Sequence, residues 1–327
     1  MPREYKPIDL RGLRTYGVGE RHHKSSLAEF ALLPEPGASA AELLNSFPQH
    51  LGASAFRKIV SAVAAAAQHQ RPVVVAFGAH LIKVGCGPIL IDLIRRGIVK
   101  AIACNGACAI HDLEIATLGQ TSEEVAQTIR DGTFGMVAET MAFFDDAVDS
   151  AQKNQIGLGA AVGRLIVDRT SQHKAHSVFA AAWEAKIPAC VHVAVGTDTV
   201  HASSRADGAS LGAATLHDFR LICDVVSDLG ATDSSGVGGV WLNVGSAVVL
   251  PEVFLKAVSV ARNLGANLDA MTTANFDMIR HYRPRQNVLT RPVTPGRGYE
   301  VVGQHEILLP LFRQAVVEEL AQTDRRR

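Results

Sequence analysis

Short apolar runs alternate with longer helical stretches along most of this 327-residue sequence, and no other feature limits the possible fold as strongly. The run PVVVAFG (72–78) follows an Ala-rich stretch with helical spacing, and similar runs end near residues 106, 198, 245 and 275. A β-branched run bounded by Pro and Gly is typical of a buried parallel strand. Strands separated by helices predict an α/β fold with a doubly wound, mostly parallel, Rossmann-like sheet.

The stretches between these runs have helical spacing. They predict helices over 55–70, 87–97, 122–132, 162–186, 215–230, 250–265 and 306–321. Residues 1–54 are rich in Pro, Gly, Ser and His, which predicts an irregular arm with short helices. No internal repeat or low-complexity linker divides the remainder, so residues 55–327 are expected to form one Rossmann-like domain.

The charge balance gives the whole chain no electrostatic attraction to nucleic acid or an anionic membrane, because Lys+Arg and Asp+Glu are equal at 32 each. The N-terminus lacks the apolar core of a signal peptide, and no apolar run reaches a membrane span of about eighteen residues. A cytoplasmic protein is the expectation. Five scattered cysteines indicate reduced thiols, and Cys104 and Cys108 lack the second pair that a zinc site needs.

Ligands of a doubly wound sheet bind at the carboxyl ends of its strands, which turns five loops into candidates for a binding site. These loops span 78–87, 104–114, 192–212, 243–251 and 272–285, and they are dense in Gly, Asn, Asp and His. Glycines allow close approach of backbone N–H groups to a phosphate, and helix N-termini favour negative charge. The loops therefore suit a nucleotide, although neither GxGxxG nor GxxxxGK[ST] follows a strand.

Several of these loops, taken in order, resemble the deoxyhypusine synthase family. FGAHLIKVGCGPILIDLIRRGIVKAIACNGACAIHDLE is similar to the family's stretch of strand, loop, helix and second strand. IPACVHVAVGTDTVHASSRADGASLG resembles its "IPV…DGSLG" segment, WLNVGSAVVLPEVF its Gly-rich strand end, TTANFD its "TAQEFD", and EVVGQHEILLPLF its C-terminal motif. The resemblance covers about 73–317. It implies a NAD-dependent, homotetrameric enzyme, with 55–327 as the NAD-binding and catalytic domain.

The resemblance also implies which residues face NAD. Position by position they are Gly85, Asn105, Gly106, Asp207, Gly208, Gly245, Ser246, Thr273 and Ala274. The match is partial, because Ala79 and Lys83 replace serines of the family's first loop and Gln304 replaces an aspartate.

The family's polyamine chemistry finds fewer counterparts. Its nucleophilic lysine lies in a "WGK" motif, and the corresponding segment here, FDMIRHYRPRQNVLTRP, contains neither lysine nor tryptophan. Arg285 or Gln286 stands where the family has a glutamate, Ala213 where it has an aspartate, and Pro251 where it has a histidine. Four positions that handle the polyamine are therefore lost together.

The segment 280–292 carries four arginines and no acid. A polyamine beside them would meet repulsions on the order of a few kcal/mol each at an effective dielectric near 20. Arginines instead suit a carboxylate or phosphate. We therefore expect a small anionic metabolite, held by Arg280, His281, Arg283 and Arg285 with His201; the same segment is also compatible with a salt-bridged tetramer interface.

His111 opens a predicted helix near the expected nicotinamide and is the candidate general acid or base, while Asp112 beside it suits a helix cap. Lys83 is either an anion-binding or relocated imine-forming lysine or a solvated loop residue. Asp277 lines the substrate side or forms a turn. His192, Asp198 and His201 could approach a metal, but nothing fixes their spacing, and we predict no metal site.

These observations favour a NAD-dependent enzyme that oxidises or redox-isomerises a small anionic metabolite. Two alternatives stay open. One is a deoxyhypusine or homospermidine synthase-type aminobutyl transferase with a relocated lysine, and the other is a non-catalytic NAD-binding or scaffold protein.

Overall fold

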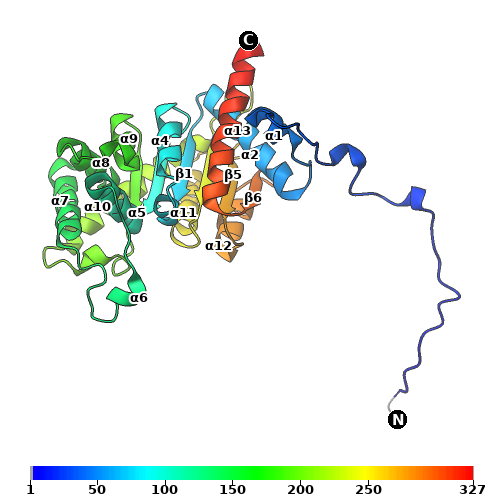
Figure 1. The fold of residues 1–327 in the computed structure, drawn as a ribbon, viewed down its shortest axis with the longest axis horizontal. Coiled ribbons are helices and arrows are strands. Elements are labelled where there is room, and N and C mark those ends of the chain that lie inside the picture. Colours follow the sequence, from blue (N-terminus) through cyan, green and yellow to red (C-terminus); the bar gives the residue numbers. More distant parts are fainter. Residues whose placement is uncertain (1–2, 327) are drawn as a thin grey trace.

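The computed structural model describes residues 3–326 and contains one six-stranded parallel sheet (Figure 1). The strands are β1 (Val73–Phe77), β2 (Ala101–Asn105), β3 (Ala189–His192), β4 (Val240–Val244), β5 (Thr272–Asp277) and β6 (Gly298–Val302). Their spatial order is β3-β2-β1-β4-β5-β6, and every neighbouring pair is parallel. This is the doubly wound Rossmann order, and it confirms the predicted fold class.

Helices cover both faces of the sheet. They are α1 (Ala40–Ser46), α2 (Leu51–Gln68), α3 (His80–Lys83), α4 (Gly87–Arg95), α5 (Gly106–Leu118), α6 (Val125–Thr128), α7 (Ala138–Asn154), α8 (Leu158–Asp168), α9 (Val178–Glu184), α10 (Gly208–Ser227), α11 (Val249–Asn263), α12 (Tyr282–Pro284) and α13 (His305–Arg326). A π-helix, Arg285–Thr290, follows α12 directly.

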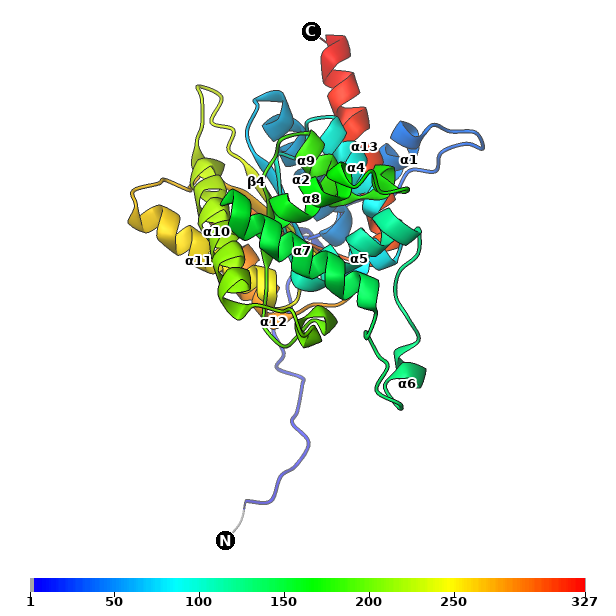
Figure 2. The same ribbon diagram turned by 90° about the vertical axis from the view of Figure 1, so that its left-hand side faces the viewer.

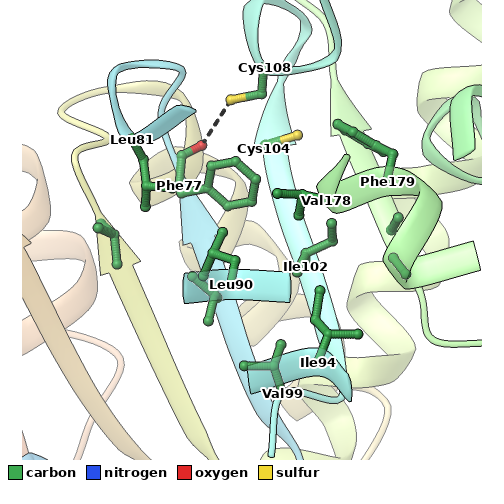
Figure 3. Close-up of a cluster of buried hydrophobic side chains, with 14 of the residues drawn as sticks. Phe77, Leu81, Leu90, Ile94, Val99, Ile102, Cys104, Cys108, Val178 and Phe179 are labelled. Carbon is green, nitrogen blue, oxygen red and sulfur yellow. Dashed lines mark hydrogen bonds between the residues drawn. The ribbon is translucent and has the colours of Figure 1, made fainter. Parts of the chain in front are cut away.

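Alternation along the strands divides the core between the two faces. Phe77 and Ile102 face one side and pack under α4, α5 and α9, together with Cys104, Cys108 and Phe179 (Figure 3). Val74 and Trp241 face the other side, where α10 and α11 cover them, and the Trp241 ring stacks on Phe254 with ring centroids 4.3 Å apart. All five cysteines are buried as free thiols, as the sequence predicts.

Two predicted helices were wrong, and two longer elements were missed. The helix predicted over 162–186 is two helices, α8 and α9, because the carboxylate of Asp112 accepts the Val178 backbone N–H at 2.8 Å and so starts a new helix. The helix predicted over 122–132 is the single turn α6, which lies in a loop that extends away from the body (Figure 2). The helix α7 and the strand β6 were not predicted at all.

Residues 3 to about 24 extend away from the body without joining the sheet (Figures 1 and 2), whereas the backbones of Glu29 and Leu32 hydrogen-bond to those of Gln49 and Ser46. The predicted boundary at 54/55 falls inside α2, and α1 already packs against α13. Within residues 3–326, no helix combines the length and the apolar character needed to cross a bilayer.

Candidate functional site

The strand order reverses between β1 and β4, so the ligand crevice of this fold is expected beside the carboxyl ends of these two strands. Gly78 ends β1, and a Cβ atom added there would lie 2.2 Å from the Gly245 carbonyl oxygen after β4. Gly245 itself has φ +59°, and an added Cβ would lie 2.9 Å from the ring of His305. His305 meets the ring of His80 edge-to-face at 5.8 Å. The two glycines therefore allow the ends of β1 and β4 and the ring of His305 to pack closely at this edge of the sheet.

A pocket of about 410 Å³ lies at the same edge of the sheet, beside the start of α5. Lys83 from α3, His111 and Glu114 from α5, Glu123 from the projecting loop and Asp198 from the loop after β3 supply its ionisable groups. Hydroxyl groups of Thr121 and Thr140 and the apolar side chains of Ile110, Leu118, Val125, Phe134 and Val137 complete most of the wall. The pocket is large enough for a small metabolite.

A chain of hydrogen bonds starts at His111. Its Nδ1 lies 2.7 Å from the hydroxyl oxygen of Thr121, and that hydroxyl donates to Glu114 Oε2 at 2.5 Å. The other oxygen of Glu114 accepts the hydroxyl of Thr140 at 3.0 Å. Burial lowers the pKa of His111, opposed by Glu114 and reinforced by the positive charge of Lys83. The imidazole is therefore neutral near pH 7.

Asp198 forms the opposite end of the pocket wall. Its side chain is only 5% exposed, and its Oδ2 has no hydrogen-bond partner among the described residues. This oxygen lies against the first turn of α5, 2.1 Å from where a Cβ on Gly106 would stand. Burial raises the pKa of Asp198.

His201 and His192 lie behind Asp198. His201 Nδ1 accepts the backbone N–H of Gly196 at 3.1 Å, and its Nε2 is 3.9 Å from Asp198 Oδ2. His192 is buried, which lowers its pKa to about 4. Residues 3–326 contain no cluster of His, Cys, Asp and Glu arranged to hold a metal, so these three do not form one.

The structure thus brings together Lys83, His111 and Asp198, which come from three of the five candidate segments predicted from the sequence. Asn105 adjoins them as the N-cap of α5, where its Oδ1 accepts the Cys108 N–H at 3.3 Å. The preceding glycine loop also reaches this edge, with Gly85 at φ +79° between α3 and α4.

Other implied cofactor residues lie elsewhere. Thr273 and Ala274 are fully buried inside β5, and the Thr273 hydroxyl donates to the Val288 carbonyl at 2.8 Å. Neither side chain has exposed surface to offer a ligand. Asp207 and Gly208 start α10, where the Asp207 carboxylate caps the helix by accepting the N–H of Ser210 at 3.0 Å.

The arginine segment lies at the end of β5, three strand spacings or about 14 Å from the end of β2. Arg280 pairs with Glu300 at 2.7 Å and Arg283 with Glu252 at 3.2 Å. Asp277 is buried beside it, with His281 4.0 Å away. The segment and His111 therefore do not share one pocket, and two of its arginines are already paired with acids of the same chain.

Sequence reasoning missed the three groups that continue the chain of hydrogen bonds from His111: Glu114, Thr121 and Thr140. A signal existed for Glu114, because residues three apart on a helix share a face and His111 was already a candidate. Thr121 lies beyond the helix and Thr140 on a helix that was not predicted, so neither carried a signal.

Solved structures with this fold include three that cover most of the chain. A conserved LOR/SDH protein from Methanococcus maripaludis S2 matches with TM-score 0.52 and 14% identity over 88% of this chain and 74% of its own. A protein assigned as a deoxyhypusine synthase from Entamoeba histolytica matches with TM-score 0.50 and 12% identity over 86% and 94%. AgrE, solved with ornithine and NAD+, matches with TM-score 0.51 and 13% identity over 82% of this chain.

This chain spans only 33% of the length of AgrE. The similarities confirm the predicted resemblance to deoxyhypusine synthases at the level of the fold. No protein-family model and no curated protein matches the sequence.

Proposed function

We propose that this chain is a NAD-dependent enzyme that oxidises or redox-isomerises a small polar metabolite, with His111 as the group that exchanges a proton. The observation that carries the proposal is the position of the His111 pocket at the carboxyl edge of a sheet in Rossmann order, close to the crevice between β1 and β4. The complex of AgrE with ornithine and NAD+ supports the choice of cofactor.

The strand ends beside the crevice could accept the pyrophosphate of a dinucleotide, but the N-terminus of α5 could not. Gly85 is exposed and Gly245 is half-buried at this edge of the sheet, so their backbones, with Ser246 next to Gly245, are open to an approaching pyrophosphate, whereas Gly78 is buried against the Gly245 carbonyl. The first turn of α5 at Gly106 is instead occupied by the carboxylate of Asp198, so a phosphate cannot share it. We therefore assign cofactor binding to Gly85, Gly245 and Ser246, and assign Asn105 to the border of the substrate pocket.

Bound NAD would supply a hydride acceptor, and the remaining work falls to the chain. His111 would take the proton from the group being oxidised, and Asp198 would accept a hydrogen bond from the substrate. The charges that line the pocket, those of Glu114, Glu123 and Asp198 against Lys83, favour a substrate with a hydrogen-bond donor or an amino group over a simple anion. A zwitterionic or hydroxylated metabolite could interact both with the carboxylates and with Lys83.

An acidic side chain placed in the crevice tests the cofactor assignment. Ala247→Glu sets a carboxylate beside Ser246, and its repulsion of the pyrophosphate should weaken NAD binding at least about tenfold. Isothermal titration calorimetry with NAD+ measures the change. Ala185→Glu, an identical exposed substitution at the opposite edge of the sheet, should bind as the unmodified protein does. Equal binding by both variants, or no binding by the unmodified protein, would remove the crevice as the NAD site.

One observation favours a second candidate, the aminobutyl transferase. Lys83 lines the same pocket as Glu114 and Asp198, so a lysine and carboxylates that could hold an amine lie together. The aminobutyl transferase hypothesis predicts that borohydride reduction in the presence of spermidine and NAD+ leaves an adduct on Lys83, detectable by peptide mass spectrometry. Under the first proposal no lysine adduct forms, and Lys83→Arg retains NAD-dependent turnover. An adduct lost in Lys83→Arg would establish the transferase instead.

The anionic substrate and the homotetramer stay predictions. Arg285 is exposed in the π-helix and remains the arginine with most freedom to bind an anion, whereas Arg280 and Arg283 are engaged by Glu300 and Glu252.

A further inference from the structure

The donor and the acceptor can be assigned in both hydrogen bonds that link His111, Thr121 and Glu114. The Thr121 hydroxyl has one hydrogen, and at 2.5 Å from Glu114 Oε2 that hydrogen lies toward the carboxylate. Thr121 can therefore only accept from His111, so Nδ1 must carry the imidazole proton. Nε2 of the neutral ring is then left with a bare lone pair, and it has no hydrogen-bond partner within residues 3–326.

Glu114 is itself held in place. Thr121 donates to one of its oxygens and Thr140, from α7, to the other, and the side chain is only 15% exposed. The carboxylate lies 3.8 Å from His111 Nδ1, too far for a direct hydrogen bond and close enough to stabilise a positive imidazole. Thr121 bridges this gap.

We propose that Thr121 and Glu114 are positioning residues that hold His111 as a general base, with Nε2 facing the pocket. The inference rests on the proposed function, because it deepens the role given there to His111. The arrangement is a carboxylate acting on an imidazole through an inserted hydroxyl, which fixes the tautomer and stabilises the protonated ring.

In the reaction that His111 would serve, NAD+ takes up the hydride, so the electrons balance. An alcohol or amine group H–C–X–H, with X oxygen or nitrogen, would lose its X–H proton to Nε2 of His111 and its C–H hydride to NAD+. The products would be C=X, NADH and a protonated His111, whose charge Glu114 would offset. The proton would leave to solvent before the next cycle.

Four ionisable side chains line the pocket together with His111. Glu114 lies on its own helix, Lys83 on α3, Glu123 on the projecting loop and Asp198 on the loop after β3. Glu114 favours the protonated ring and Lys83 opposes it. Removing the Thr121 hydroxyl should weaken the influence of Glu114 and leave Lys83 in place.

The test compares Thr121→Val with Thr121→Ser, using nitrogen-15 NMR of His111 assigned by its loss in His111→Gln. In the unmodified protein and in Thr121→Ser we expect the Nδ1–H tautomer. In Thr121→Val we expect the Nε2–H tautomer and a lower pKa. Thr117→Val is the matched control, because Thr117 lies on α5 with His111 and its hydroxyl donates only to the backbone carbonyls of Leu113 and Glu114.

Activity gives the second readout. The rate of NADH formation with a responsive hydroxy or amino acid should fall about tenfold to a hundredfold in Thr121→Val, with the acidic limb of its pH profile moved to lower pH, and recover in Thr121→Ser. An Nε2–H tautomer in the unmodified protein, or an unchanged pH profile in Thr121→Val, would overturn the proposal. If the tautomers behave as expected but no substrate yields NADH, the positioning stands and the oxidation proposal fails.

Discussion

Gly159→Ala is expected to destabilise the protein by about 3 kcal/mol, at the upper end of the range for overpacked cores. Gly159 lies in the first turn of α8, where a Cβ atom would stand 2.2 Å from the carbonyl oxygen of Ala189 and 2.6 Å from its carbonyl carbon. Both atoms belong to the backbone of β3, so no side chain can rotate to make room. Either the helix or the strand must shift.

Urea unfolding of Gly159→Ala and Gly212→Ala measures this effect against a matched control. Gly212 lies within α10, is exposed, and has nothing within 4 Å of an added Cβ. Alanine there should leave the free energy of unfolding unchanged or raise it by up to about 1 kcal/mol through helix propensity. A Gly159→Ala protein as stable as the unmodified one would show that α8 does not pack against β3 as closely as described.

Asp218→Asn should change how stability depends on pH. Asp218 is buried in α10, where its Oδ2 accepts the backbone N–H groups of Gly159 at 3.0 Å and Val191 at 2.8 Å. Burial raises the pKa of this carboxyl to about 7, whereas the unfolded chain titrates near its ordinary value of 3.8. Between these two values the unfolded state ionises and the folded state does not, so raising the pH favours unfolding.

The unmodified protein should therefore lose stability relative to Asp218→Asn by about 1.4 kcal/mol per pH unit between pH 5 and 7, or about 3 kcal/mol in all. Above pH 8 the difference should stay constant, because both states of Asp218 are then ionised. Other groups titrate in both proteins and cancel. Urea unfolding at pH 5, 6, 7 and 8 gives the four differences, and a difference independent of pH would show that Asp218 is ionised throughout.

These two residues also bear on the proposed site. Gly159 packs against the backbone of β3 and Asp218 accepts a hydrogen bond from it, and β3 ends at His192, before the loop that carries Asp198. A shift of this strand would move Asp198 relative to His111. Variants at both positions should therefore be examined for NAD-dependent activity as well as for stability.

Much of the fold followed from the sequence because its strands are apolar on both faces. VVVAF and VWLNV read as short runs that only a sheet covered on both sides can bury, and five of the six strands were found in this way. Strand β6, GYEVV, escaped because it lies at the edge and is only partly buried, so it carries no such run. Helix α7 does carry apolar residues at helical spacing, and its pattern was overlooked.

The candidate site also has a part that the sequence predicted and a part that it did not. Loops at the carboxyl ends of the strands, and His111 and Lys83 within them, were predictable because a parallel sheet brings all such ends to one edge. The arginine segment looked like an anion site, but the sequence could not show that Glu300 and Glu252 approach Arg280 and Arg283. Those acids come from another strand and another helix, so only folding sets the distances.

The sequence by itself determined the alternation of strands and helices, the edge of the sheet that carries the candidate pocket and the histidine that lines it, since each depends on local pattern and sheet geometry. Only the tertiary structure decided which groups meet His111. Thr121 from a projecting loop, Glu114 one turn along α5 and Thr140 from α7 converge within hydrogen-bonding distance of one another. Hydrogen bonds act over about 3 Å, and the positions of side chains at that scale arise from packing between elements far apart in the chain.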